Sequence, residues 1–461
     1  MPSLFPEKKI RKSVNPALII SLSFSLTILA GAVLLFLPVS SRPGHAVPFL
    51  TALFTSTSAV CVTGLTVVDT GAHFSRFGQF IIMGLIEVGG LGIITFSTLF
   101  TLMFAERMSM KNRMITRDAM DDFDANRLGT LVKHILMYTF IIEFIGAAVM
   151  FSRFYPKYGL ETGLFNSAFH AVSAFCNAGF SLFSNNYQGY KHDALFTVTN
   201  ALLVIIGGIG FIVLLDLRQY LREKLKANPA IRLKYHSKIV LKVTAWLLLT
   251  GTVMIFLLEG NHTLTDMTVF EKIYNAFFLS ASCRTAGFNT VPTGALLPAT
   301  LFICTILMFI GASPGSTGGG IKTTTFAIII SSLKAMTYDK EHVVMNKKTI
   351  SRKSVNKAIT IAGTALFIVS SVTLILTIAE RNNSLIAHHD FFLHIWFEVI
   401  SAMGTVGLSA GVTPFLGSFS RIILIAVMFL GRVGPLTMAL ALSSNVTHVK
   451  IKYSEGRLTI G

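Results

Sequence analysis

A glycine-rich stretch near the middle of the chain contains residues that could cradle a phosphate group. Residues 311–326 read GASPGSTGGGIKTTTF, and Gly315 and Gly320 have the spacing of a phosphate-binding loop. In that pattern a lysine follows the second glycine directly, but here Ile321 comes before Lys322. The apolar residues before the stretch predict a membrane helix, not a strand, and no cytosolic segment is long enough for a nucleotide domain. A nucleotide-driven membrane enzyme is therefore disfavoured.

Four strings with a common glycine point to a different chemistry, the coordination of a cation by backbone oxygens. Each has a glycine followed by Leu or Phe and then by Thr, Ser or Asn: SAVCVTGLT (58–66), SAFCNAGFS (173–181), SCRTAGFN (282–289) and SAMGTVGLS (401–409). Carbonyl oxygens on one side of an extended backbone can replace the hydration shell of a monovalent cation. Glycine permits the backbone angles that this requires. Four strings at matched positions favour a binding role over four plain turns.

The third string departs from the spacing of the others. In three strings Ser-Ala stands six and five residues before the glycine. In the third, Ser282 is one residue too close to Gly287 and Ser280 is one residue too far. The sequence leaves the register of this string open.

The composition places these strings in a membrane protein. The 461 residues are 52% hydrophobic and 13% charged, with a mean hydropathy of +0.66, whereas soluble domains carry roughly 25% charged residues. We expect the first apolar run to be a retained helix and not a cleaved signal peptide, because further spans follow it. A span needs about 20 apolar residues, and eight runs are predicted to cross: 17–37, 79–104, 132–150, 195–217, 239–258, 297–310 continuing past the glycine-rich break, 358–378 and 422–442.

The basic residues behind the net charge of +17 are concentrated in alternate connections between the predicted spans. Lys and Arg are enriched in cytoplasmic loops, so both termini are predicted to be cytoplasmic, and nucleic-acid binding is not needed to explain the charge. Membrane lipid is an expected partner, and some of the basic charge can also meet a partner protein or anionic lipid. The four cysteines contain no CxxC pair, which disfavours a zinc site or a disulfide framework. Five segments hold 26 of the 39 Lys and Arg residues: 1–13, 105–130, 218–238, 334–357 and 446–461.

The connections on the opposite side predict an internal repeat. Each contains an apolar segment too short to span, which predicts a re-entrant helix; these segments are 48–60, 163–175, 269–281 and 391–402. Four copies of helix, short helix, glycine turn and helix result, and because each copy crosses twice, all four are oriented alike around an axis along the membrane normal. The predicted fold is an all-α polytopic membrane protein with four M1–pore helix–M2 repeats, hence eight transmembrane helices, around a pseudo-fourfold pore. The predicted units are 1–13, repeats 14–110, 111–225, 226–345 and 346–445, and 446–461.

The strings VTGL, NAGF, TAGF and TVGL after four short helices resemble the filter strings of the Trk/Ktr/HKT potassium transporter superfamily. GASPGSTGGGIKTTTF resembles the intramembrane loop in the third repeat of the Ktr and Trk branch. With eight predicted spans, the chain looks more like a KtrB membrane subunit than like TrkH. The resemblance implies potassium uptake across the bacterial plasma membrane. It also implies a homodimer above a cytosolic ring of KtrA-type nucleotide-binding subunits.

The resemblance also implies site residues. The bound ion would be potassium, with sodium as a second candidate and no organic cofactor in this chain. Gly64 favours potassium, because some plant relatives that prefer sodium have serine there. The filter carries over onto Val62, Thr63, Gly64, Asn177, Ala178, Gly179, Thr285, Ala286, Gly287, Thr405, Val406 and Gly407.

The glycine-rich stretch, in the range 311–325, is predicted to be a flexible barrier below the filter. A proline removes a backbone donor and breaks the helix, and unwound backbone is tolerated at membrane depth where it lines water. We expect Lys322 to anchor the cytoplasmic end of the loop and the mid-helix Arg432 to line the pore. The gate residues are Gly311, Ala312, Ser313, Pro314, Gly315, Ser316, Thr317, Gly318, Gly319, Gly320, Lys322 and Arg432.

Other charged and titratable residues at membrane depth leave alternatives open. Glu87, Glu143 and Glu398 can pair with Arg432, bind backbone amides or lie at interfaces, and the sequence does not choose. Lys133 and Lys242 are near cytoplasmic ends and can snorkel, and His170 and His394 are predicted to pack in the core. The alternative function is a sodium- or proton-coupled cation carrier with alternating access.

Overall fold

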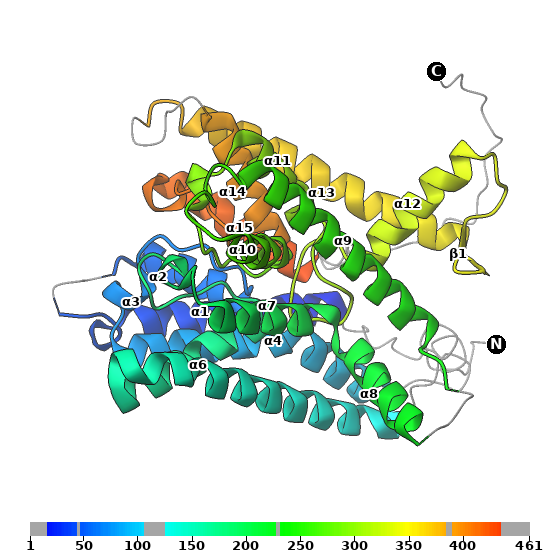
Figure 1. Ribbon diagram of the computed structural model, residues 1–461, viewed down its shortest axis with the longest axis horizontal. Helices are drawn as coiled ribbons and strands as arrows, with labels where there is room; N and C mark the ends of the chain where they lie inside the picture. Colours follow the sequence, from blue (N-terminus) through cyan, green and yellow to red (C-terminus); the bar gives the residue numbers. More distant parts are fainter. Residues whose placement is uncertain (1–15, 44–46, 106–124, 227–230, 384–389, 435–461) are drawn as a thin grey trace, which may run out of the picture.

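The computed structural model describes residues 16–43, 47–105, 125–226, 231–383 and 390–434, and these residues are mostly helical (Figure 1). The exception to the expected all-helical class is a hairpin of β1 (Val344–Met345) and β2 (Lys348–Thr349). Asn346 and Lys347 make its two-residue turn with φ of 46° and 64°, as tight hairpins require. Four single turns of 3₁₀ helix are η1 (Pro38–Ser40), η2 (Gln188–Tyr190), η3 (Thr293–Ala295) and η4 (Thr413–Phe415).

The first part of the chain forms a long helix, a short helix and a second long helix. They are α1 (Pro16–Phe36), α2 (Phe49–Val60) and α4 (Arg76–Ala105), with the single-turn α3 (Thr70–His73) before α4. All three larger helices pack against one another. The short apolar segment predicted at 48–60 is therefore a helix between two longer ones.

The second part contains two breaks at glycine. In α6 (Ala125–Phe175), Gly159 has φ 73° and ψ −173°, which separates a long helix from a short one that follows it. Gly210, with φ 102°, separates α7 (Ala194–Ile209) from α8 (Phe211–Leu225), and the two are bent by 101°. The crossing predicted at 195–217 is therefore not one continuous helix, because Gly210 adopts a left-handed conformation that ends α7.

The third and fourth parts follow the same order. The third has α9 (Tyr235–Glu259), α10 (Val269–Ser282), α11 (Pro298–Phe309) and α12 (Thr323–Thr337), with a non-helical loop between the last two. The fourth has α13 (Arg352–Ala379), α14 (Phe391–Gly404) and α15 (Ser418–Val433). Helix α15 ends before Gly434, whose φ is 92°. The rest of the run predicted at 422–442, both predicted cytoplasmic termini and most of the predicted cytoplasmic segment 105–130 lie outside the described residues.

The packing of the helices forms a closed ring. The second long helix of each part contacts the helix that carries the next short segment: α4 contacts α6, α7 contacts α10, and α11 contacts α14. The ring closes because α15 contacts α2, so the last part packs on the first (Figure 1). This arrangement brings all four short helices around one centre.

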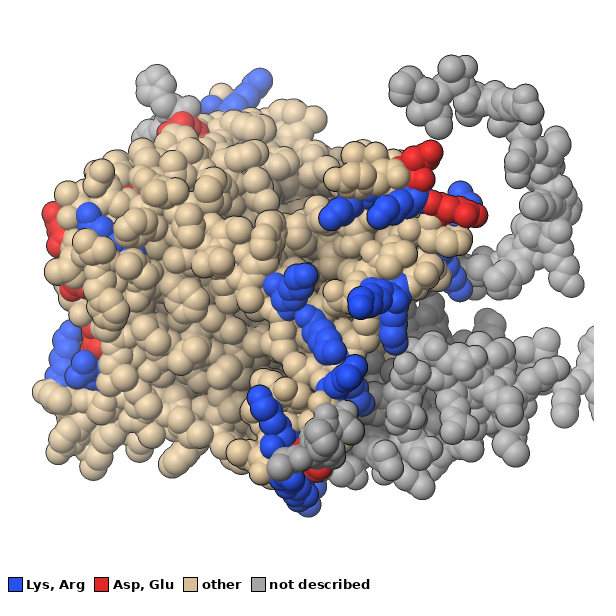
Figure 2. Space-filling model, turned by 45° about the vertical axis from the view of Figure 1, so that its right-hand side comes forward, with Lys and Arg blue, Asp and Glu red and all other residues tan. Residues whose placement is uncertain are grey.

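The outer surface of the bundle is apolar. Phe144, Leu257 and Phe367 on long helices are 70–75% exposed, and Figure 2 shows a broad uncharged band beside a group of Lys and Arg side chains. By length and composition, four described helices can cross a membrane individually, and the bent pair of α7 and α8 makes up to five. The chain is therefore a membrane protein in which the predicted crossing at 195–217 is a bent pair of helices and the one that begins at 297 is a short helix followed by a loop.

Candidate functional site

The four glycine strings meet at one place, where their glycines form a ring. Gly64, Gly179, Gly287 and Gly407 all have positive φ, between 72° and 94°. A Cβ atom on Gly179 would lie 3.1 Å from the Cα of Gly287 and 3.2 Å from that of Gly64. The other three glycines are equally close to neighbouring strings. A side chain at any of these positions would disturb the ring as well as strain its own backbone.

The carbonyl oxygens just before these glycines face the next string around the ring. A Cβ atom on each ring glycine would contact one of these oxygens. In the order Gly64, Gly179, Gly287 and Gly407, the oxygens belong to Ala178, Ala286, Val406 and Thr63. All four residues are fully buried, and among the described residues no group donates a hydrogen bond to these four oxygens. Buried carbonyls without a partner cost free energy. A ring of four such oxygens can instead coordinate a dehydrated monovalent cation.

A second left-handed residue precedes each ring glycine by two positions. Val62, Asn177, Thr285 and Thr405 have φ between 48° and 77°, a region that side chains make costly by about 1–2 kcal/mol per residue. The resemblance named these four residues as part of the filter, but nothing in the sequence indicated their left-handed backbone. The equivalence of these four residues also settles the register of the third string, because Thr285 stands where Val62 and Asn177 stand in theirs.

A serine on each short helix supports the string that follows. The hydroxyls of Ser58 and Ser401 each accept a hydrogen bond from the ring glycine of their own string at 3.0 Å. The hydroxyl of Ser173 donates to the carbonyl of Phe180 at 2.8 Å, and that of Ser282 donates to Phe288 at 2.5 Å. In the third string, Ser282 and not Ser280 therefore has this role. Sequence reasoning had noted these serines but gave them no function.

The short helices end beside the ring. Helices α2, α6, α10 and α14 end three to five residues before the glycine of their string. The C-terminal end of a helix carries a partial negative charge of roughly half an electron. Four such ends around one point favour a cation there.

A polar cavity of ≈ 140 Å³ lies on one side of the ring. The four ring glycines line it, together with residues that follow them in the strings, such as Thr66, Ser181, Asn289 and Ser409. The side chains of Asp69 and Asn186 add further oxygens and an amide to its wall. The cavity can hold a hydrated ion at the entrance to the ring.

The loop between α11 and α12 lies on the other side of the ring. A Cβ on Gly318 would collide with the hydroxyl of Thr285, and one on Gly319 with that of Thr405. Both threonines precede the ring glycines, so the loop covers the face of the ring away from the polar cavity. The consecutive glycines allow this close approach.

This loop is also bonded to the break between α7 and α8. The amide of Ser313 donates to the carbonyl of Gly208 at 3.0 Å, and the amide of Thr317 donates to Gly207 at 3.3 Å. In return, the amide of Phe211 donates to the carbonyl of Gly315 at 2.9 Å. The backbone groups that have no helical partner at these two breaks thus form hydrogen bonds with one another.

Lys322 and Arg432 both bind backbone carbonyls of the loop. The Nζ of Lys322 donates to Gly318 at 2.8 Å, so the lysine closes its own loop and does not resemble a phosphate-binding lysine. Arg432, which is 4% exposed, donates to the carbonyl of Thr317 and, at 2.5 Å, to that of Gly89. Among the described residues no carboxylate pairs with Arg432, so it is a buried cation held by backbone oxygens.

The intramembrane acids have other partners. Glu398 accepts hydrogen bonds from Ser409, from Thr413 and from the amide of Ala410. Glu87 accepts a weak one from the thiol of Cys176 at 3.5 Å, and Glu143 lies beside the same thiol. Glu398 therefore fixes the backbone after the fourth string.

One histidine and two lysines have the surroundings that the sequence predicted, and one buried arginine was not predicted. His170 is buried and stacks on Phe183 at 4.6 Å, as expected of a core histidine. Lys133 and Lys242 are exposed, as snorkelling requires. The missed residue is the buried Arg284, which donates to the carbonyl of Gly311 at 3.4 Å; its position inside the third string was the available signal.

A helical membrane bundle with four converging backbone strings is typical of a membrane transport protein. Residues 8–449 match the TrkH family, described as cation transport protein. The chain therefore belongs to the TrkH family of cation transport proteins.

Known relatives are similar in sequence to this chain over nearly its whole length. The Ktr system potassium uptake protein B of Bacillus subtilis is 38% identical over 449 residues, 97% of each chain. Its namesake from Vibrio alginolyticus is 40% identical over 96% of this chain and 94% of its own. The potassium/sodium uptake protein NtpJ of Enterococcus hirae is 36% identical over 99% of both. These relatives confirm the predicted resemblance to KtrB-like proteins.

A solved structure shares the fold. The crystal structure of the potassium transporter TrkH from Vibrio parahaemolyticus superposes with a TM-score of 0.73 at 18% identity. The match covers 95% of this chain and 87% of that one. The two chains therefore have the same helical architecture.

Proposed function

We propose that this chain conducts potassium into the cell through the ring of carbonyl oxygens, as the membrane subunit of a Ktr-type uptake system. The observation that carries the proposal is the set of four buried carbonyls, at Thr63, Ala178, Ala286 and Val406, that have no donor among the described residues. Such oxygens can replace the water around an ion that has lost its hydration shell. The relatives named potassium uptake proteins support potassium as the ion and a transporter in place of an enzyme.

In this proposal the four parts of the chain are repeats around one pore. Each contributes two crossings, a short pore helix and a filter string, for eight crossings in all, including the interrupted ones. The closed packing order of α4, α7, α11 and α15 on the next part supports this. A ring of parallel repeats argues against alternating access, which works by rocking two halves around a site.

The loop at 311–325 acts as the gate in this proposal. It covers the inner face of the ring through Gly318 and Gly319, so potassium passes only when these residues move aside. Lys322 and Arg432 hold it in the closed position through its carbonyls. Its flexible glycines make such a movement possible at small cost.

The proposal also includes partners and compartment. A pore loop held shut needs a signal to open, and we infer a homodimer on a cytosolic ring of KtrA-type nucleotide-binding subunits, in the bacterial plasma membrane with both termini cytoplasmic. The name Ktr system, borne by two relatives, supports a multi-subunit assembly. Sodium dependence is a specific question, because the relative from Enterococcus hirae is named a potassium/sodium uptake protein.

Rubidium uptake and potassium-limited growth test the proposal in cells that lack their own potassium uptake systems. The wild-type chain with its partner should restore both. Gly64→Ser should lower the preference for potassium over sodium about tenfold, the equivalent of ~1.4 kcal/mol, because Gly64 has φ 94° and abuts Gly179. Gly84→Ser is the matched control, since nothing lies within 4 Å of a Cβ there. If neither ion enters under any partner condition, the ion-pore proposal fails.

A further inference from the structure

Helix α8 departs from the direction of the bundle. It begins at Phe211, directly after the glycine break, and runs at 101° to α7. Helix α7 packs inside the bundle, and α8 leads away from it (Figure 1). Its sequence, FIVLLDLRQYLREKL, lies at the start of a segment rich in Lys and Arg.

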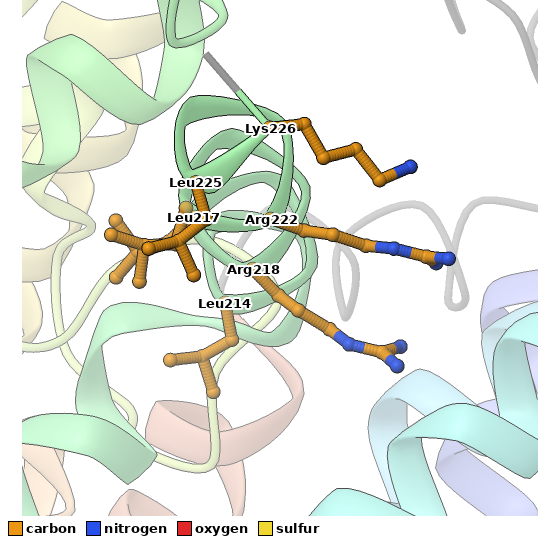
Figure 3. Close-up of a pocket in the computed structure, with 7 residues that line it drawn as sticks. Leu214, Leu217, Arg218, Arg222, Leu225 and Lys226 are labelled. Atoms are coloured by element: carbon orange, nitrogen blue, oxygen red, sulfur yellow. The ribbon is translucent and has the colours of Figure 1, made fainter.

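Two stripes of opposite character run side by side along α8. Residues three and four apart share one face of a helix, and the apolar stripe is strongly exposed, with Leu221 at 51% and Leu225 at 88%. Figure 3 shows the leucines on one side of the helix and the basic side chains extending from the other. The apolar stripe is Leu214, Leu217, Leu221 and Leu225, and the basic stripe is Arg218, Arg222 and Lys226.

These seven residues line one open groove of ≈ 600 Å³. The acidic residues of α8 leave most of the basic charge uncompensated. Asp216 is buried and accepts a hydrogen bond from the amide of Lys234, and Glu223 pairs with Lys226 at 3.6 Å. Arg222 is exposed, and the exposed Arg218 places its guanidinium 5.2 Å from the centre of the Tyr138 ring on α6. Neither arginine has a carboxylate partner among the described residues, so both guanidinium charges are available to an anion.

We propose that α8 binds an anionic phospholipid of the inner leaflet. The leucine stripe would contact the acyl chains, and Arg218 and Arg222 would bind the phosphate. An amphipathic helix of this kind lies in the membrane interface with its apolar face towards the acyl region. Basic side chains next to it attract anionic headgroups. The combination of exposed leucine and arginine in one groove fits a lipid, which offers both an alkyl chain and a phosphate.

A lipid at this place would also act on the loop below the ring. Helix α8 starts where Phe211 donates to Gly315, and Gly207 and Gly208 accept from the same loop. A lipid that holds α8 in the interface therefore holds this set of hydrogen bonds in place. The lipid site itself rests on the geometry of α8, whereas this effect on conduction rests on the proposed function.

Lipid retention by the full-length protein tests the site without measuring ion flux. The purified protein in detergent is titrated with phosphatidylglycerol or phosphatidylcholine and bound lipids are counted by native mass spectrometry. Wild type should retain phosphatidylglycerol at least about tenfold more tightly. Arg218→Gln combined with Arg222→Gln should weaken that retention, about fivefold for each arginine. Free inorganic phosphate should not displace the lipid.

The matched control removes two positive charges outside the groove. Lys224→Gln combined with Lys238→Gln changes exposed residues of the same cytoplasmic face and should leave retention within about twofold. A second variant, Leu221→Asn with Leu225→Asn, should weaken retention of both lipids, and because both leucines are exposed it should leave the fold intact. Normal thermal unfolding of each variant confirms folding.

Three results would overturn the lipid site. These are equal retention of the two lipids by wild type, an equal loss in the lysine control, and displacement by inorganic phosphate. The site is also wrong if the arginine variant keeps its lipid but no longer binds a cytosolic partner subunit, because the groove would then be a protein interface. A protein that retains the lipid but does not transport rubidium leaves the lipid site standing and removes the proposed function instead.

Discussion

Arg432 on α15 donates a hydrogen bond to the carbonyl of Thr317 in the loop between α11 and α12. A second donor of the same guanidinium binds Gly89 on α4 at 2.5 Å. One buried cation thus joins the first, third and fourth parts of the chain beneath the glycine ring. In the proposed function this charge repels other cations and holds the loop closed.

Neutralising Arg432 should raise rubidium uptake. Arg432→Gln removes a buried charge and the hydrogen bonds of the guanidinium to Thr317 of the loop and to Gly89 of α4. We expect about a tenfold increase, since a unit charge nearby contributes a barrier of ~1–2 kcal/mol at an effective dielectric constant of about 20. Arg421→Gln is the control on the same helix; its guanidinium binds the carbonyl of Pro414. Unchanged uptake by a well-expressed Arg432→Gln protein would remove this residue from the mechanism.

Shortening the loop should open the pore. Deletion of residues 316–319 removes the two glycines against Thr285 and Thr405 and the carbonyl that Arg432 binds. Rubidium uptake without the cytosolic partner should then rise several-fold above wild type. A control, Thr317→Val, keeps the loop length and loses the hydroxyl contacts with Phe175 and Asn177. A folded deletion variant with ordinary uptake would contradict a gate at this loop.

The two serines of α10 should differ in their effect on selectivity. Ser282 donates to Phe288 behind the third string, whereas Ser280 donates to Leu248 on α9 at 3.1 Å. Each replacement by Ala removes one buried hydrogen bond, at a cost of about 1 kcal/mol in stability. Only Ser282→Ala should change the ratio of potassium to sodium uptake. The same change in both variants would indicate a general loss of packing.

Acid should weaken the start of α10 through Glu271. The amide of Thr268, at 2.7 Å, and the side chain of His192, at 2.9 Å, hold the pKa of Glu271 down at about 2. A carboxyl with a lowered pKa in the folded state stabilises the protein above its unfolded pKa of about 4.3. It loses that contribution as the pH falls from there through about 2.

Thermal unfolding in detergent between pH 5 and pH 2 checks this contribution. The melting temperature of wild type should fall more steeply with acid than that of Glu271→Gln, which cannot titrate. The control Thr268→Val keeps the carboxyl but loses the hydroxyl cap, so it should be less stable at pH 5 and have a smaller acid dependence. Parallel curves for wild type and Glu271→Gln would show that Glu271 does not contribute.

The sequence predicted the glycine strings because they repeat, and repetition is visible in one chain. It did not predict the bend at Gly210, since the largely apolar run at 195–217 has the same composition whether its helix is straight or broken. The partners of Arg432 were also hidden. A sequence shows where carboxylates are, but the groups that bind this arginine are backbone carbonyls, which every residue has.

The register of the third string shows the same limit on a smaller scale. Counting residues back from Gly287 gave two candidate serines, Ser280 and Ser282. The backbone angle of Thr285 and the hydrogen bond of Ser282 decide between them. Both depend on how an extra residue is absorbed at the end of α10, which spacing alone cannot show.

The contact of α15 with α2 has a consequence for synthesis of the protein. The carbonyl of Thr63 takes part in a ring whose last member, Val406, is translated more than 300 residues later. A nascent chain on the ribosome therefore has no complete set of four oxygens until its final quarter has been inserted. Incomplete products, including those of premature stop codons, therefore contain no complete ring and, in the proposed function, no finished ion path.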